Sequence, residues 1–140
     1  MSLYKYTTQI EPQRTIAEIG DMLIAYDVVG LLTEYEGRQV KSVSFSIKIG
    51  EQNVQFRMPC NWRGVHEIMK NDPKCTPKLR TEEQAIRVAW RIIHAWIEAQ
   101  LAMVEVNMVT LPQIFLPYAV MHDGLTIADK FTSNPQLLLD

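Results

Sequence analysis

The chain has 140 residues, of which 47% are hydrophobic and 21% charged, and its formal net charge at pH 7 is −2. This composition excludes an intrinsically disordered chain, and the small negative charge argues against indiscriminate binding of nucleic acids. A chain of this length buries enough surface to fold without disulfide bonds. We therefore expect one domain over 1–140, with an irregular lead-in over 1–12 and a loosely packed tail over 122–140.

Sequence features that are missing from the chain bear on its location and redox state. No apolar run reaches the roughly 18 residues of a membrane span, and the N-terminus lacks a secretory signal, so we expect a cytoplasmic protein without a membrane partner. Cys60 and Cys75 are the only cysteines. They form no CxxC pair and have no histidine at zinc-ligand spacing, so we expect reduced thiols, no metal and no cofactor. A disulfide between them is the alternative.

The first patterned segment, residues 13–27, has the apolar spacing of a helix. Ile16, Ile19 and Leu23 recur at intervals of three and four residues. Thr15 is followed three residues later by Glu18, which is the spacing of a capping box. The pattern predicts a short N-terminal helix after Pro12, with Thr15 as its N-cap if the helix begins there.

From residue 28 the apolar period changes to two, which predicts three strands. They cover 28–35, 39–49 and 53–58, with turns at Gly37 and Gly50. In the middle strand, Val43, Phe45 and Ile47 point to one face. The opposite face carries polar side chains, namely Ser42, Ser44, Ser46, Lys48, Gln55 and Arg57. This polar face is either a plain solvent face or a binding surface.

The second half of the chain is expected to be helical. Asn61 is expected to cap a short helix over 62–71, and prolines predict a loop over 71–80. The segment 81–107 is apolar around most of a helical wheel, and Thr81 and Gln84 have the spacing of a capping box. Pro112 and Pro117 interrupt residues 110–124, and a last helix is expected at 125–132.

These elements predict an α+β fold in the order α-β-β-β-α-α. A three-stranded antiparallel meander packs on a long C-terminal helix, with a short N-terminal helix beside them. The surplus of apolar surface on the long helix also predicts a homodimer.

A narrow polar band interrupts the apolar surface of the long helix. It consists of Gln84, Arg87, Arg91, His94, Glu98 and Glu105. One interpretation is a solvated stripe with i,i+4 pairs, Glu83 with Arg87 and His94 with Glu98. The other is an anion-binding stripe, because Arg87 and Arg91 lie one turn apart and a bound anion would relieve their repulsion.

Positive charge is concentrated in the middle of the chain. Residues 57–91 hold eight Lys or Arg against four acids, whereas residues 92–140 hold one against five. The candidate binding residues are Arg57, Arg63, Lys74, Lys78, Arg80, Arg87, Arg91 and His94. They predict a basic surface for a nucleic acid or an acidic protein surface, although the loop 70–80 alone is also consistent with a solvated connection.

No catalytic motif is recognisable in the chain. It lacks a glycine-rich phosphate loop, a nucleophile elbow and a metalloprotease HExxH. We therefore expect a non-enzymatic binding protein. The alternative function is an oligomer that sequesters a nucleotide signal through Arg87 and Arg91.

Three segments carry a family resemblance: "VKSVSFSIKIGEQNVQFRMP", "TEEQAIRVAWRIIHAWIEAQLAMVEVNMV" and "IFLPYAV". Together they resemble small uncharacterised proteins encoded in bacteriophage and prophage genomes, over roughly residues 15–121. The resemblance implies a mobile-element accessory protein inside a bacterial host cell, with a partner in recombination or anti-defence, and it implies no catalytic residue. The order of elements is also similar to the double-stranded-RNA-binding domain, in topology only.

Overall fold

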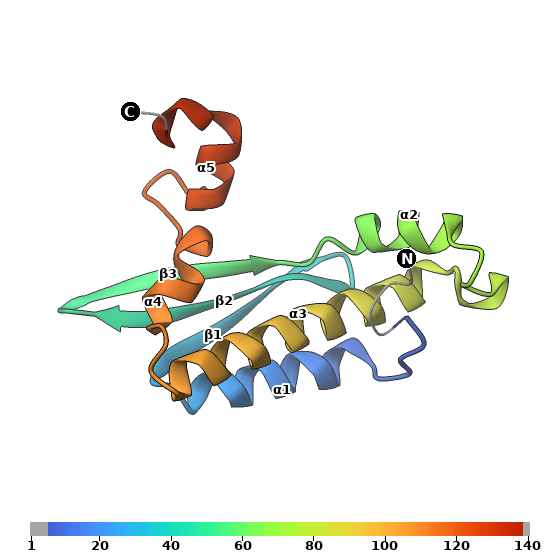
Figure 1. Cartoon of the computed structure of the whole chain (residues 1–140), viewed down its shortest axis with the longest axis horizontal. Coiled ribbons are helices and arrows are strands. Elements are labelled where there is room, and N and C mark those ends of the chain that lie inside the picture. The colour runs from blue at the N-terminus through green and yellow to red at the C-terminus, as the bar shows by residue number, and fades with distance from the viewer. Residues whose placement is uncertain (1–5, 139–140) are drawn as a thin grey trace. The chain divides into compact units, whose positions relative to one another are not determined.

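The computed structural model describes residues 6–138 (Figure 1). Its α-helices are α1 (Pro12–Ile24), α2 (Trp62–Asn71), α3 (Glu82–Glu105), α4 (Leu111–Phe115) and α5 (Ile127–Ser133). The strands are β1 (Val28–Glu36), β2 (Gln39–Ile49) and β3 (Gln52–Pro59), and short 3-10 turns are η1 (Pro77–Leu79), η2 (Leu116–Tyr118) and η3 (Pro135–Leu138). This order confirms the predicted α+β class and the long helix.

The described chain divides into two compact units. We call residues 6–22 and 60–99 the helical unit, and residues 23–59 and 100–138 the sheet unit. The expected single domain stays a prediction. Within the described residues, no helix is both long and apolar enough to cross a membrane.

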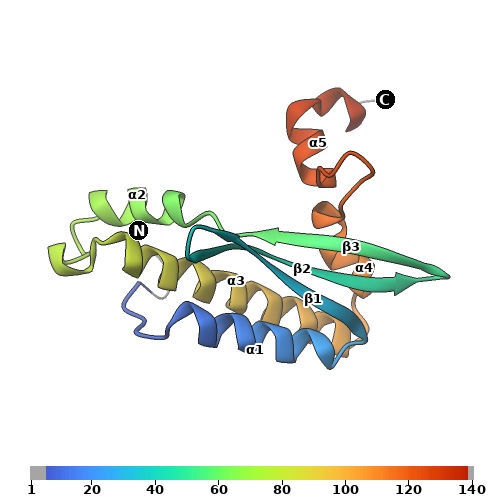
Figure 2. The same ribbon diagram turned by 180° about the vertical axis from the view of Figure 1, so that it is seen from behind.

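In the helical unit, α1 lies alongside α3 (Figures 1 and 2). The predicted start of α3 is confirmed, because the Gln84 backbone N–H donates to Thr81 Oγ1 at 3.1 Å. The candidate N-cap at Thr15 does not cap α1. The helix begins at Pro12, a residue type that suits a first helical position, so Thr15 lies inside the helix and is fully buried.

The core of the helical unit joins α2, η1 and the first turns of α3. Met69, Cys75, Ala85 and Val88 form a buried cluster against which Trp62 packs. Asn61 caps α2 as predicted, with its side chain accepting from the Gly64 N–H at 3.1 Å. Cys60 and Cys75 are both buried and unbonded to each other. Burial raises the pKa of Cys60 to about 12, which keeps this thiol protonated.

In the sheet unit, the strands pair antiparallel in the order β1-β2-β3, as predicted. Phe45 on β2 lies opposite Phe56 on β3. The ring of Phe115 from α4 packs edge-on against the ring of Phe45, with 4.9 Å between the ring centroids. The helix α4 was not predicted. Its capping box joins Thr110 and Gln113, and the intervening Pro112 sits in the first turn, where proline is tolerated.

The two outer edges of the sheet differ. At β3, the Val120 N–H donates to the Gln55 carbonyl at 2.8 Å, so a later segment occupies part of that edge. At β1, the pairing with β2 shifts register at Gly30, which has φ +71°, and again after Glu34. Such bulges interrupt the regular backbone pattern and disfavour the addition of another strand.

Candidate functional site

The polar band of α3 does not face water along its first half, because α1 covers it. The carboxylate of Glu18 on α1 lies at the centre, with Oε1 3.2 Å from Arg91 Nη1 and 3.1 Å from His94 Nε2. The same Arg91 nitrogen donates to Thr15 Oγ1 at 3.3 Å. We call Thr15, Glu18, Arg91 and His94 the seam cluster.

The seam cluster pairs Glu18 with Arg91 within the helical unit. Arg91 and His94 are 9% and 8% exposed, so water contributes little to solvating them. The hydrogen bond from Arg91 is the largest cause that lowers the pKa of Glu18, and the nearby charges of Arg91, His94 and Arg14 act in the same direction against the effect of burial. Nη1 of Arg91 therefore has its partners within this chain, whereas its buried Nε has none among the described residues.

Arg87 is satisfied in a similar way nearer the start of α3. Its Nε lies 3.0 Å from a carboxylate oxygen of Glu11, and its Nη1 donates to Gln84 Oε1 at 3.2 Å. The Gln84 amide in turn donates to the carbonyls of Tyr6 and Thr8, at 2.9 and 2.8 Å. Acceptors of the N-terminal segment thus occupy the place that the anion-stripe interpretation assigned to a ligand.

The basic loop between α2 and α3 is braced by Arg80. Its guanidinium donates to the carbonyls of Cys75 at 2.9 Å and Asp72 at 3.0 Å, and the Arg80 carbonyl lies 3.1 Å from His66 Nε2. The Lys74 N–H also donates to Asp72 Oδ1 at 2.9 Å. These contacts define the backbone of the loop, so it is more than a loosely solvated connection.

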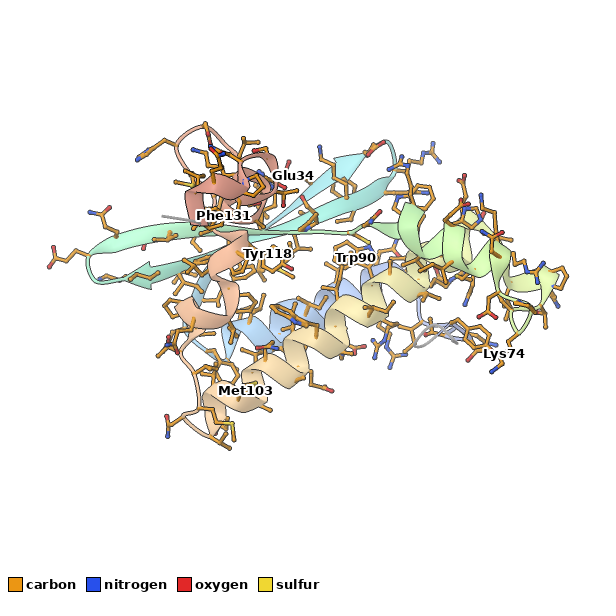
Figure 3. The ribbon with its side chains drawn as sticks, turned by 45° about the horizontal axis from the view of Figure 1, so that its top comes forward. Glu34, Lys74, Trp90, Met103, Tyr118 and Phe131 are labelled. Atoms are coloured by element: carbon orange, nitrogen blue, oxygen red, sulfur yellow. The ribbon has the colours of Figure 1, made fainter. Side chains whose placement is uncertain are left out.

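Two lysines project to solvent from this braced loop. Lys74, labelled in Figure 3, and Lys78 are exposed. Lys74 directly follows a shallow groove of about 360 Å³ that is lined by Glu67, Ile68, Asn71, Asp72 and Pro73. Ile68 is 51% exposed there, and Lys70 is paired with Glu67 at 3.2 Å.

The eight predicted binding residues do not share one environment. Arg57 belongs to the sheet unit, where its Nη2 donates to the Gly124 carbonyl at 2.7 Å. Arg80, Arg87, Arg91 and His94 have the partners described above, and the Arg63 guanidinium lies 4.6 Å from the centre of the Trp62 ring. Lys74 and Lys78 remain as the exposed lysines of this set.

The sequence interpretation missed Glu11, Thr15 and Glu18 as the partners of the polar band. A signal was present, because Glu11 and Glu18 are seven residues apart, as are Arg87 and His94. Side chains seven apart return to the same helix face after two turns, so two facing helices bring such sets into contact. Recognising this requires knowing that α1 and α3 are neighbours.

The part of the chain that the structure describes contains no group of three or more His, Cys, Asp or Glu side chains placed to hold a metal ion. Comparison with known protein families, with curated proteins and with solved structures finds no match.

Proposed function

We propose that this protein is a non-enzymatic binding module that docks on an acidic protein surface, in the setting of a phage or other mobile element inside a bacterial cell. The contact is the docking face, defined as Ile68, Pro73, Lys74 and Lys78. The observation that carries the proposal is an exposed isoleucine in a shallow groove, next to lysines held on a braced loop. Apolar anchors with a charged periphery are typical of protein interfaces.

The bracing by Arg80 favours binding over a passive connection. Ordering a loop during association costs free energy, and a loop that is already held by hydrogen bonds avoids part of this cost. Lys74 and Lys78 are thus presented from a defined backbone. Their positive charge then accelerates encounter with an acidic partner.

A protein partner is favoured over a nucleic acid by the groove itself. Ile68 and Pro73 line it, and Ile68 is exposed, so the groove offers apolar surface that a protein side chain can cover and a phosphate backbone cannot. Nucleic-acid affinity depends on many cation–phosphate contacts, whereas Arg57, Arg80, Arg87 and Arg91 already donate to acceptors of this chain. The nucleotide-sequestering alternative has weaker support for the same reason, because it relies on Arg87 and Arg91.

The proposal is tested by affinity purification with the full chain from a nuclease-treated bacterial lysate, followed by direct binding of the recovered protein. We expect Ile68→Asp, and Lys74→Glu with Lys78→Glu, each to weaken that binding at least about tenfold, the loss of about 1.4 kcal/mol. Arg38→Glu with Lys48→Glu is the matched control, because it makes the same charge change at exposed positions of the sheet unit and leaves the affinity unchanged.

Two results would overturn the proposal. One is equal weakening by the control pair, which would indicate nonspecific charge attraction. The other is tight binding of a thirty-nucleotide single strand or a DNA duplex, with affinity that falls steeply as salt rises and depends on Lys74 and Lys78.

A further inference from the structure

The polar face of the sheet is less exposed than its sequence pattern suggests. The strand register places Leu32 and Glu34 of β1, Ser42, Ser44 and Ser46 of β2, and Gln55 and Arg57 of β3 on this face, which we call the serine face. Ser42 is 3% exposed and Ser44 only 1%. These serines are therefore withdrawn from water.

The hydroxyls of Ser42 and Ser44 have no hydrogen-bond partner among the described residues. A buried polar group in this state carries a free-energy cost that native proteins ordinarily avoid. Each of the two serines lines a hollow on the serine face, of about 280 Å³ at Ser44 and about 190 Å³ at Ser42. The two serines with unsatisfied hydroxyls thus line hollows that a ligand can enter.

The two hollows differ in chemistry. The hollow at Ser44, lined also by Gly30, Leu32, Ser46 and Gln55, combines apolar surface with hydroxyl and amide groups. The hollow at Ser42 is lined by Lys41, Arg57, Glu34 and Pro59, so two cations and one carboxylate leave one net positive charge. Figure 3 labels Glu34 on β1. The first suits an apolar side chain and the second suits a carboxylate.

We propose that the serine face binds an extended peptide segment of a partner protein, with an apolar side chain at Ser44 and an acidic side chain two residues away at Ser42. Ser42 and Ser44 are two residues apart on one strand, which corresponds to about 6.6 Å at 3.3 Å per residue. Alternate side chains of an extended peptide have the same spacing. Polar groups of the bound peptide then supply the hydrogen bonds that the two hydroxyls lack.

The segment lies across the face and is not added as a further strand. The bulges of β1 disfavour pairing at that edge, and Val120 already occupies part of the edge at β3. Arg57 is oriented by its hydrogen bond to the Gly124 carbonyl, which holds one guanidinium nitrogen beside the hollow. The Arg57 side chain that lines the hollow at Ser42 is therefore already oriented before the peptide binds.

The test is an NMR titration of the full chain with capped pentapeptides. The probes are Thr-Val-Thr-Asp-Thr and the reverse order, Thr-Asp-Thr-Val-Thr, with Thr-Val-Thr-Lys-Thr as the charge control. We expect one acidic peptide to shift backbone amide signals of residues 41–46 and their cross-strand neighbours, saturating with a Kd on the order of 1 mM. The lysine peptide leaves those signals in place.

Matched variants separate this site from general attraction. Ser42→Ala with Ser44→Ala is expected to keep or raise the melting temperature and to weaken peptide binding about fivefold or more. Lys41→Gln weakens it, whereas Lys48→Gln, the same change on the same strand outside the hollows, does not. Absence of saturable shifts, shifts centred elsewhere, or unchanged affinity in the double alanine variant would each overturn the proposal. Lys74→Glu with Lys78→Glu leaves this titration unchanged, which keeps it distinct from the docking face.

Discussion

The seam cluster of the helical unit and the serine face of the sheet unit both withdraw polar side chains from water, but they satisfy those side chains to different extents. In the seam cluster, Glu18 accepts from Arg91 and lies within 3.1 Å of His94, and Thr15 accepts from Arg91. On the serine face, the hydroxyls of Ser42 and Ser44 have no partner in the part of the chain that the structure describes. In the seam cluster, Arg91 Nε also lacks a partner among the described residues, so the two regions differ in how far hydrogen bonds compensate for burial.

The difference separates structural polar groups from groups available for binding. Removing one member of a satisfied cluster leaves the others buried and uncompensated, which destabilises the fold. Removing an unsatisfied hydroxyl relieves a cost already present in the native state. The free energy of unfolding of matched variants should therefore change in opposite directions in the two regions.

The largest expected effect comes from Glu18→Ala. It leaves Arg91, whose side chain is 10% exposed, without its carboxylate. We expect the free energy of unfolding to fall by about 2 kcal/mol, less than for a fully buried pair because Glu18 is partly exposed. Denaturant unfolding measures the change. Asp21→Ala, an exposed acid on the same helix, is the control and should change the free energy by no more than about 0.5 kcal/mol. Equal effects would mean that the seam cluster contributes no specific stability.

The sharpest contrast between the regions is Thr15→Val against Ser44→Ala. Thr15→Val replaces a hydroxyl that accepts from Arg91 by a methyl group of similar shape, and should cost about 1.5 kcal/mol. Ser44→Ala removes an unsatisfied hydroxyl, and should leave the fold unchanged or stabilise it by up to about 1 kcal/mol. Parallel thermal and denaturant unfolding compares the two. Destabilisation by both variants to the same extent would remove the distinction.

Acidification is expected to lower the free energy of unfolding by a smaller amount, because it neutralises Glu18 without removing the side chain. The Arg91 hydrogen bond lowers the folded-state pKa of Glu18 below its unfolded-state value. The stability it contributes is therefore present above the unfolded pKa and is lost as the pH falls through the folded pKa. We expect the stability difference between wild type and Glu18→Gln to shrink on acidification below the ordinary carboxyl range. A constant or growing difference would contradict this assignment.

The smallest effect is expected from Arg87→Ala. Its partner Glu11 is 61% exposed, so water and salt screen the pair. A loss of about 0.5 kcal/mol is expected, decreasing as salt is added. A double-mutant cycle with Glu11→Ala isolates the pair. A coupling energy comparable to that of Glu18 with Arg91 would show that exposure does not distinguish the two ion pairs.

Part of the candidate sites was readable from the sequence. Alternation in 39–49 correctly separated Val43, Phe45 and Ile47 from the serines, and proline and charge patterns correctly marked the basic loop. The bracing of this loop by Arg80 was not predicted, because its acceptors are backbone carbonyls, which residues of every type carry. The burial of Ser42 and Ser44 was also missed, since polarity in alternate positions is typical of a solvent face.

Local sequence was sufficient for the strands, the long helix α3 and the caps at Asn61 and Thr81, because helix and strand periods and capping depend on residues within a few positions of one another. Long-range packing determined which polar residues have hydrogen-bond partners within the chain. Arg91 finds Thr15 and Glu18 at sequence separations of 76 and 73. A local pattern places a side chain on a face of its own element, whereas the hydrogen-bond partner that decides its role comes from whichever distant segment packs there.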